Sequence, residues 1–250
     1  MMCVPPTTQS QLQGSSLCFC VKCQGAPARE KGSMAEDFEW AQPHPELHKV
    51  CTLFGRLELR APLAWRYRPL PSLLQQGPQC GLVALAMLSG APVDAIQAHA
   101  HAQGYTSQGE LFSCAHMLEL AQRFLRPPAT CRLYSGRLDD APIKRFLLQG
   151  GCLLVPYDTA KDNSPGLQGG RKAHWGVVSG AIDTGRALFV VARHGKARNV
   201  GIWALTELAD SNQQLRASAP ECAHLRLPPG GIDGPSGLNG RSVLVQLGDS

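Results

Sequence analysis

Apolar residues follow helical spacing in the middle of the chain, ahead of a second half built from short apolar runs. Residues 80–89 are apolar on every side, so this segment is predicted to be a buried helix. Further helices are predicted over residues 92–104, 109–125 and 141–151 from apolar periodicity and from glycines at their ends. The run at 51–59, ahead of these helices, is predicted to be a strand.

The second half consists of short apolar runs bounded by glycine and other turn residues. Strands are predicted at 152–158, 174–183, 187–195 and 242–247. The turn Asp183-Thr184-Gly185 predicts a hairpin between the second and third of them, and residues 202–215 are predicted to form one more helix. Helices followed by an antiparallel sheet indicate the α+β class.

The beginning of the chain has a different composition from the rest. Because residues 1–45 are rich in Pro, Gln, Ser, Thr and Gly without periodicity, we expect a weakly ordered segment there and one folded domain over 46–250. Cys20 and Cys23, with Cys18 beside them, have the C-x-x-C spacing of half a zinc site. No second pair follows at finger-like spacing, so we expect neither a metal nor a cofactor.

Charge and hydropathy exclude two classes of partner. The 24 Lys and Arg against 19 Asp and Glu give a formal charge of +5, but these residues are scattered, which argues against a nucleic-acid partner. The longest apolar run, 80–92, is interrupted and shorter than the about 18 residues that a membrane span needs. With no signal-peptide pattern at the start, we expect a cytoplasmic protein whose ten cysteines are thiols.

Cys80 lies at the junction between a polar turn, residues 75–79, and the buried helix. Backbone N–H groups in the first turn of a helix have no helical partner, and the helix dipole is positive there. Both effects favour a thiolate, so we expect a lowered pKa for Cys80, with Gly81 leaving open space beside the sulfur. Such a thiolate is a nucleophile for acyl transfer, whereas the alternative is an ordinary buried cysteine.

His174 is the candidate base for this cysteine. It begins a predicted core strand and shares a strand face with Gly176, which keeps that face uncrowded. A long polar loop precedes it and ends in Arg171 and Lys172, two cations that favour an acidic partner. Of the other histidines, His99 and His101 are placed on a helix surface, and His116 is expected to be a structural residue beside an apolar stripe. Three more lie in irregular segments, namely His44, His48 and His224.

A glutamine shortly before the nucleophile is suited to stabilise an oxyanion together with the Cys80 backbone N–H. Gln75, Gln76 and Gln79 are all close enough in sequence. Gln79 adjoins the cysteine and is expected to point elsewhere, so Gln75 is preferred, followed by Gln76.

Several separated blocks together resemble a known family. The blocks "QGPQCGLVALAML", "GYTSQGELFS", "VPYD" and "HWGVVSG" resemble the papain-like cysteine peptidases of the bacteriocin-processing (C39-like) type. More closely, residues 50–250, including "IWALTELADSNQQL", resemble the actin maturation protease family.

This resemblance implies a papain-like fold, in which a nucleophile helix packs on an antiparallel sheet. It also implies aminopeptidase activity. It implies that Cys80 is the nucleophile, His174 the general base and Gln75 an oxyanion donor. The implied substrate is the N-terminal acetylated Met or Cys of monomeric actin, with profilin as a further partner. The long proline run associated with profilin binding is absent from the N-terminal segment.

One part of the family pattern has no match here. Papain-like enzymes orient the histidine with an Asn or Asp on the next strand, where this chain reads "VVARHGK". Asp183, Asn199, a backbone carbonyl and a water remain as alternatives. Two other functions remain open as well: a papain-like peptidase for another substrate, and an inactive actin-binding module.

Overall fold

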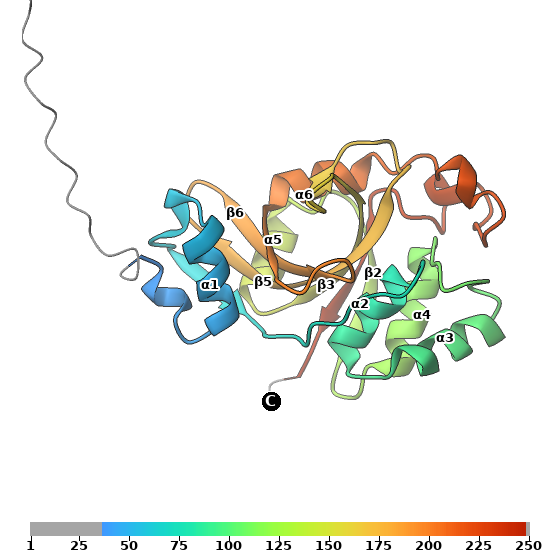
Figure 1. Cartoon of the computed structure of the whole chain (residues 1–250), viewed down its shortest axis with the longest axis horizontal. Helices are drawn as coiled ribbons and strands as arrows, with labels where there is room; N and C mark the ends of the chain where they lie inside the picture. The colour runs from blue at the N-terminus through green and yellow to red at the C-terminus, as the bar shows by residue number, and fades with distance from the viewer. Residues whose placement is uncertain (1–36, 249–250) are drawn as a thin grey trace, which may run out of the picture. The chain divides into compact units, whose positions relative to one another are not determined.

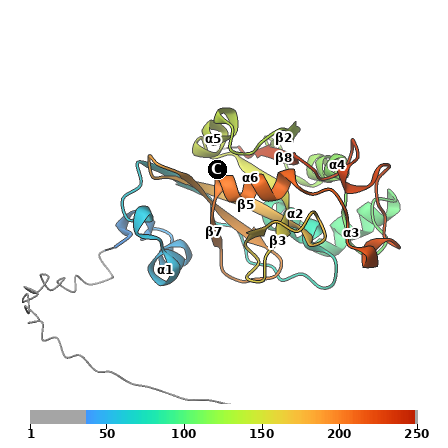
Figure 2. The same ribbon diagram turned by 90° about the horizontal axis from the view of Figure 1, so that it is seen from above.

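The computed structural model describes residues 37–248. Residues 1–36 lie outside the described part, together with Cys18, Cys20 and Cys23 and the zinc hypothesis attached to them. The described part has an α+β architecture in which helices cover both faces of one sheet (Figures 1 and 2). None of its helices is long and apolar enough to cross a membrane.

Six α-helices occur in the described residues: α1 (Pro45–Phe54), α2 (Cys80–Ser89), α3 (Val93–Ala102), α4 (Cys114–Phe124), α5 (Ala141–Leu148) and α6 (Leu205–Gln213). The predicted helix at 80–89 is confirmed without a shift at either end. It ends at Gly90, whose φ of 71° is left-handed and whose backbone N–H donates to Ala86.

The sheet is antiparallel throughout and has eight strands in the described residues: β1 (Ala64–Tyr67), β2 (Thr130–Ser135), β3 (Cys152–Thr159), β4 (Pro165–Gly166), β5 (Ala173–Asp183), β6 (Leu188–His194), β7 (Gly201–Ala204) and β8 (Arg241–Gln246). The order is β2-β8-β3-β5-β6-β7, with β1 on β5 and β4 on β3. The predicted hairpin is confirmed as β5–β6, and its turn contains Gly185 with φ of 78°.

The two faces of the sheet have separate cores. Leu154 and Val177 face a core that contains the buried side of α2 and residues of α3 and α4. Leu153 and Val178, one position along each strand, face α5 and α6 instead. Because α2 is apolar all round, its residues 81–88 lie buried between β5 and the other helices. This is the expected papain-like arrangement, in which the helix that begins with Cys80 packs on an antiparallel sheet.

The predicted strand at 51–59 is wrong, because residues up to Phe54 belong to α1 and residues Leu57–Leu59 form a 3-10 helix. Pro45 at the first helical position starts α1, and Leu47, Val50 and Cys51 recur at helical spacing on its buried side. Phe38 and Ala41 precede residue 46, but they are buried in one hydrophobic cluster with these α1 residues.

Other segments also differ from the prediction. Residues 201–204 form β7, so the helix predicted from 202 starts only at Leu205. Helix α4 starts at Cys114, because the Ser113 hydroxyl caps it by accepting the His116 N–H. Strands β1 and β2 were not predicted, since each is short and half exposed.

Candidate active site

A pocket at the N-terminal end of α2 is lined by Cys80, His174 and Gln75, so the structure brings together the three residues singled out in the sequence. Its walls come from the loop before α4, the loop before β5 and the segment between α6 and β8. They include Leu111, Phe112, Gly170, Arg171, Cys222 and Leu225. In Figures 1 and 2 the orange-red segment between α6 and β8 lies beside α4, and the Ser113 hydroxyl donates to Ser236 across that contact at 2.8 Å.

The start of α2 is packed tightly against β5. A Cβ at Gly81 would lie 3.0 Å from the Trp175 ring, 3.2 Å from Met117 and within reach of Leu111. The expectation that Gly81 leaves open space beside the sulfur is therefore wrong. Instead, the missing side chain lets α2 approach the strand that carries His174, and the Trp175 indole N–H donates to the Leu111 carbonyl at 2.7 Å beside it.

The expected lowering of the Cys80 pKa is also wrong. Burial of the thiol is the largest effect and raises the pKa above its ordinary value of 9.0. Backbone hydrogen bonding from Trp175, the charge of Lys196 and the N–H groups of the first helical turn act in the opposite direction but do not outweigh it. Cys80 is therefore a neutral thiol at rest, which must lose its proton to become a nucleophile.

His174 is buried at the start of β5, and its ring is neutral at rest, with one nitrogen unprotonated. Burial, followed by the charges of Lys196 and His194, lowers the pKa of His174 to about 2, so the ring is neutral at neutral pH. A Cβ at Gly176 would lie 3.2 Å from the Arg193 carbonyl oxygen and 3.3 Å from the Tyr157 ring, so the absence of a side chain there leaves space for Tyr157.

Neither carboxylate nor amide candidate orients His174. Asp183 is at the opposite end of β5, where its side chain accepts the Gly185 N–H. Asn199, in the loop after β6, makes no hydrogen bond with His174, although both residues are described. The Nε2 atom of His174 is buried without a hydrogen-bond partner among the described residues. The aromatic rings nearest to it belong to Tyr157 and His194, each with its centroid 5.8 Å away.

Gln75 is fixed against the turn after β6. Its backbone N–H donates to the Gly195 carbonyl at 2.9 Å, and a Cβ at Gly195 would meet its side chain. The side-chain Nε2 donates to Gly77, and Oε1 is buried without a partner among the described residues. Gln79 points elsewhere, as expected, because its side chain bonds Gln97 and the Gln76 N–H.

Two cations and one carboxylate line the pocket. Lys196 and Arg171 form none of the ion pairs found in the described residues. The Glu110 carboxylate is occupied by four donors: the Thr106 hydroxyl and the backbone N–H groups of Ser107, Gln108 and Arg226. The pocket therefore offers positive charge to a ligand, while its carboxylate holds two walls together.

The pH dependence of stability provides a test of this role of Glu110. Burial raises its pKa, but the hydrogen bonds outweigh burial, and the net pKa lies below the ordinary value of 4.5. A group whose pKa is lower in the folded state than in the unfolded state stabilises the fold at pH values above its unfolded-state pKa. This stabilisation is lost as the pH falls through its folded-state pKa. We expect Glu110→Gln to lower the free energy of unfolding by about 1–3 kcal/mol at neutral pH.

This difference from the wild type should shrink as the pH falls below 4.5, the ordinary pKa of the group. Urea unfolding at neutral and acidic pH measures it, with Glu58→Gln as a matched change on an exposed carboxylate. An equal loss at both pH values would contradict the role of the ionised carboxylate.

Sequence reasoning missed Glu110, His194 and Lys196. Glu110 closes a turn with Thr106, a signal present in "TSQGE", but its bond to Arg226 spans 116 residues. Lys196 reaches the pocket, and His194 reaches the ring of His174, only because β6 pairs with β5, and nothing in their own segment indicates this.

A helix that begins with a cysteine packs on an antiparallel sheet that carries a histidine in the same pocket, which is the arrangement expected of a papain-like peptidase. Sequence comparison places the chain more narrowly. Residues 70–182 match the family model described as "Actin maturation protease-like, C-terminal domain". The chain is 42% identical to the actin maturation protease of Drosophila melanogaster over 84% of its own length and 81% of that protein.

The human actin maturation protease is 32% identical over 85% of this chain and 75% of its own length. The chain therefore belongs to the actin maturation protease family. A double glycine motif protease from an AMS/PCAT transporter, solved with its leader peptide, covers 72% of this chain at 11% identity, with a TM-score of 0.39.

Proposed function

We propose that this protein is a cysteine aminopeptidase of the cytoplasm that removes the acetylated N-terminal Met or Cys from actin. The observation that carries the proposal is the pocket that Cys80, His174 and Gln75 share at the start of α2. Actin as the substrate is supported by the relatives, which are named actin maturation proteases. Cys80 is the nucleophile, His174 is the general base, and Gln75 helps to stabilise the oxyanion.

The reaction starts from a neutral thiol and a neutral imidazole. His174 takes the thiol proton as the Cys80 sulfur attacks the carbonyl carbon of the acetylated residue, and the oxygen becomes an oxyanion. His174 then gives this proton to the departing nitrogen of the actin chain, which leaves a thioester on Cys80. A water molecule attacks the thioester, and its proton returns the sulfur to a thiol as the acetylated amino acid leaves.

The charges of the pocket favour a substrate with a blocked amine. A free α-ammonium needs a carboxylate partner, but the donors around Glu110 already occupy it. Lys196 and Arg171 would in addition repel a cation. An acetylated N-terminus carries no charge and avoids both costs.

Mass spectrometry of the actin N-terminus tests the proposal. Monomeric actin with an acetylated N-terminus, or with a free one, is incubated with this protein or with a heat-unfolded sample, and profilin is added to a parallel reaction. We expect loss of one residue from acetylated actin only. No loss with retained binding would favour an inactive actin-binding module, and neither loss nor binding would favour a peptidase for another substrate.

Arg171 is expected to attract an acidic substrate through its charge. Arg171→Glu should lower kcat/KM for actin by about threefold to tenfold at low salt, with a smaller loss at high salt, because screening weakens charge attraction. Lys172→Glu is the matched control, since it makes the same charge change at a neighbour that does not line the pocket. Equal losses in both variants would show a general charge effect instead.

A further inference from the structure

Among residues 37–248, no hydrogen bond holds the His174 ring, yet the proposed chemistry requires a fixed ring. Its Nε2 is buried without a partner, and neither Asp183 nor Asn199 bonds it. An imidazole free to rotate about its side-chain bonds would present the wrong atom to the thiol for part of the time, and misplacement by about 1 Å costs about 10²-fold in rate. Another contact must therefore fix it.

Two rings flank His174 from the neighbouring strands. Tyr157 on β3 is its register partner, and the rings meet edge to face at an interplanar angle of 80°. His194 on β6 is paired with Gly176, which shares a strand face with His174, and its ring meets the His174 ring at 74°. Perpendicular aromatic contacts at these distances are favourable and directional.

His194 is itself held in place. Its Nδ1 accepts the backbone N–H of Lys196 at 3.3 Å, and its ring stacks on Trp203 at 6.0 Å and 21°. Only 4% of the residue is exposed. Burial, followed by the charge of Lys196, lowers the pKa of His194 to about 4, so the ring is neutral under the conditions in which His174 works.

We propose that His194 is the positioning residue of the site, which holds the His174 ring against Tyr157 by edge-to-face contact. The ring of His194 thus takes the place of the Asn or Asp side chain that orients the histidine in papain-like enzymes. A neutral ring restricts rotation of His174 and excludes water without placing a negative charge beside it. This inference rests on the proposed role of His174 as the general base.

Removal of the ring should change a property of His174 that can be measured without any substrate. The titratable groups around His174 are Cys80 of α2, Tyr157 of β3, His194 of β6 and Lys196 of the following turn. Burial is the main reason for the low pKa of His174. His194→Ala admits water to this ring, so the His174 pKa should rise towards its ordinary value of 6.5.

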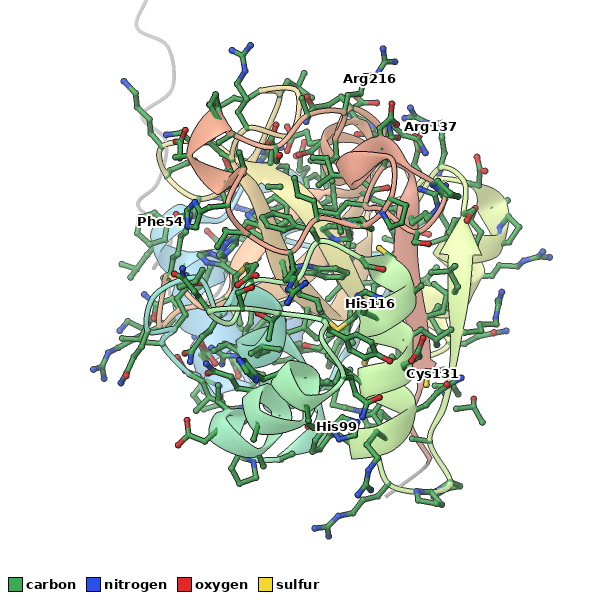
Figure 3. The ribbon with its side chains drawn as sticks, turned by 90° about the vertical axis from the view of Figure 1, so that its right-hand side faces the viewer. Phe54, His99, His116, Cys131, Arg137 and Arg216 are labelled. Carbon is green, nitrogen blue, oxygen red and sulfur yellow. The ribbon has the colours of Figure 1, made fainter. Side chains whose placement is uncertain are left out.

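The experiment compares His194→Ala with His194→Phe in the full chain. Phe keeps the ring contacts with His174 and Trp203 but loses the acceptor for the Lys196 N–H. His116→Ala is the control, because it removes a stacked histidine ring that lies outside the pocket, on α4 (Figure 3). NMR titration gives the His174 pKa, with the His174→Gln spectrum to identify its signals, and actin processing gives kcat and KM.

We expect the His174 pKa to rise by about one unit or more in His194→Ala and to stay low in His194→Phe and His116→Ala. In His194→Ala, kcat should fall by about 10²-fold with little change in KM, whereas His194→Phe should retain most of the wild-type kcat. An unchanged pKa and kcat in folded His194→Ala, or an equal loss in His194→Phe, overturns the proposal. Absence of processing by the wild type would reject the proposed function alone, since the titration needs no substrate.

Discussion

Cys80→Ala is expected to reduce the rate of actin processing by about 10⁴-fold or more, because loss of a covalent nucleophile removes the thioester route altogether. The variant should fold, since Ala is a strong helix former and Cys80 is the first residue of α2, only partly buried. The measurement is the initial rate at which the acetylated residue is lost, followed by mass spectrometry. Binding of actin should persist, because the pocket walls are unchanged.

Cys131→Ala is the matched control for this variant. Cys131 is also partly buried, but it lies on strand β2 and does not line the pocket (Figure 3). Its removal should leave the processing rate within about twofold of the wild type, because the change is small and lies away from the pocket. If Cys80→Ala retained a substantial rate, Cys80 would not be the nucleophile.

His174→Gln is expected to reduce kcat by about 10³-fold or more, because the neutral thiol of Cys80 then has no base to take its proton. Gln has similar polarity and size, so the pocket should keep its shape and KM should change little. Circular dichroism and the melting temperature verify the fold, and kinetics with actin give the two constants separately. A large rise in KM at unchanged kcat would indicate a binding role instead.

The pH profile of the wild type tests the same residue. The pKa of His174 is lowered to about 2, so its unprotonated form is present throughout the pH range in which the protein is folded. The ring therefore does not titrate within that range. We therefore expect kcat/KM to show no acidic limb near the ordinary histidine pKa of 6.5. A limb at that value would mean that the His174 ring is exposed to water during catalysis.

The sequence predicts well those features that depend on local pattern. Helix α2 follows from ten residues without a polar side and from the glycine after them, and the β5–β6 hairpin follows from two apolar runs joined by a turn. Cys80 and His174 were singled out because each lies at the start of such an element, and Gln75 because it shortly precedes Cys80; the structure places all three in one pocket.

Features that depend on packing between distant segments were not predictable. The raised pKa of Cys80 reflects burial of its thiol, whereas sequence reasoning considered only the helix terminus. The ring contact between His174 and His194 depends on the pairing register of two strands. Short half-exposed strands such as β2 lack the apolar run that identifies a core strand.

The position of β8 has a consequence for synthesis of the protein. This strand is the last described element of the chain, yet it pairs with β2 on one side and β3 on the other, within the sheet. Until it emerges from the ribosome, β2 and β3 have no shared neighbour and expose unpaired edges. A chain cut short before residue 241 should therefore yield an aggregation-prone fragment rather than a folded domain of reduced activity.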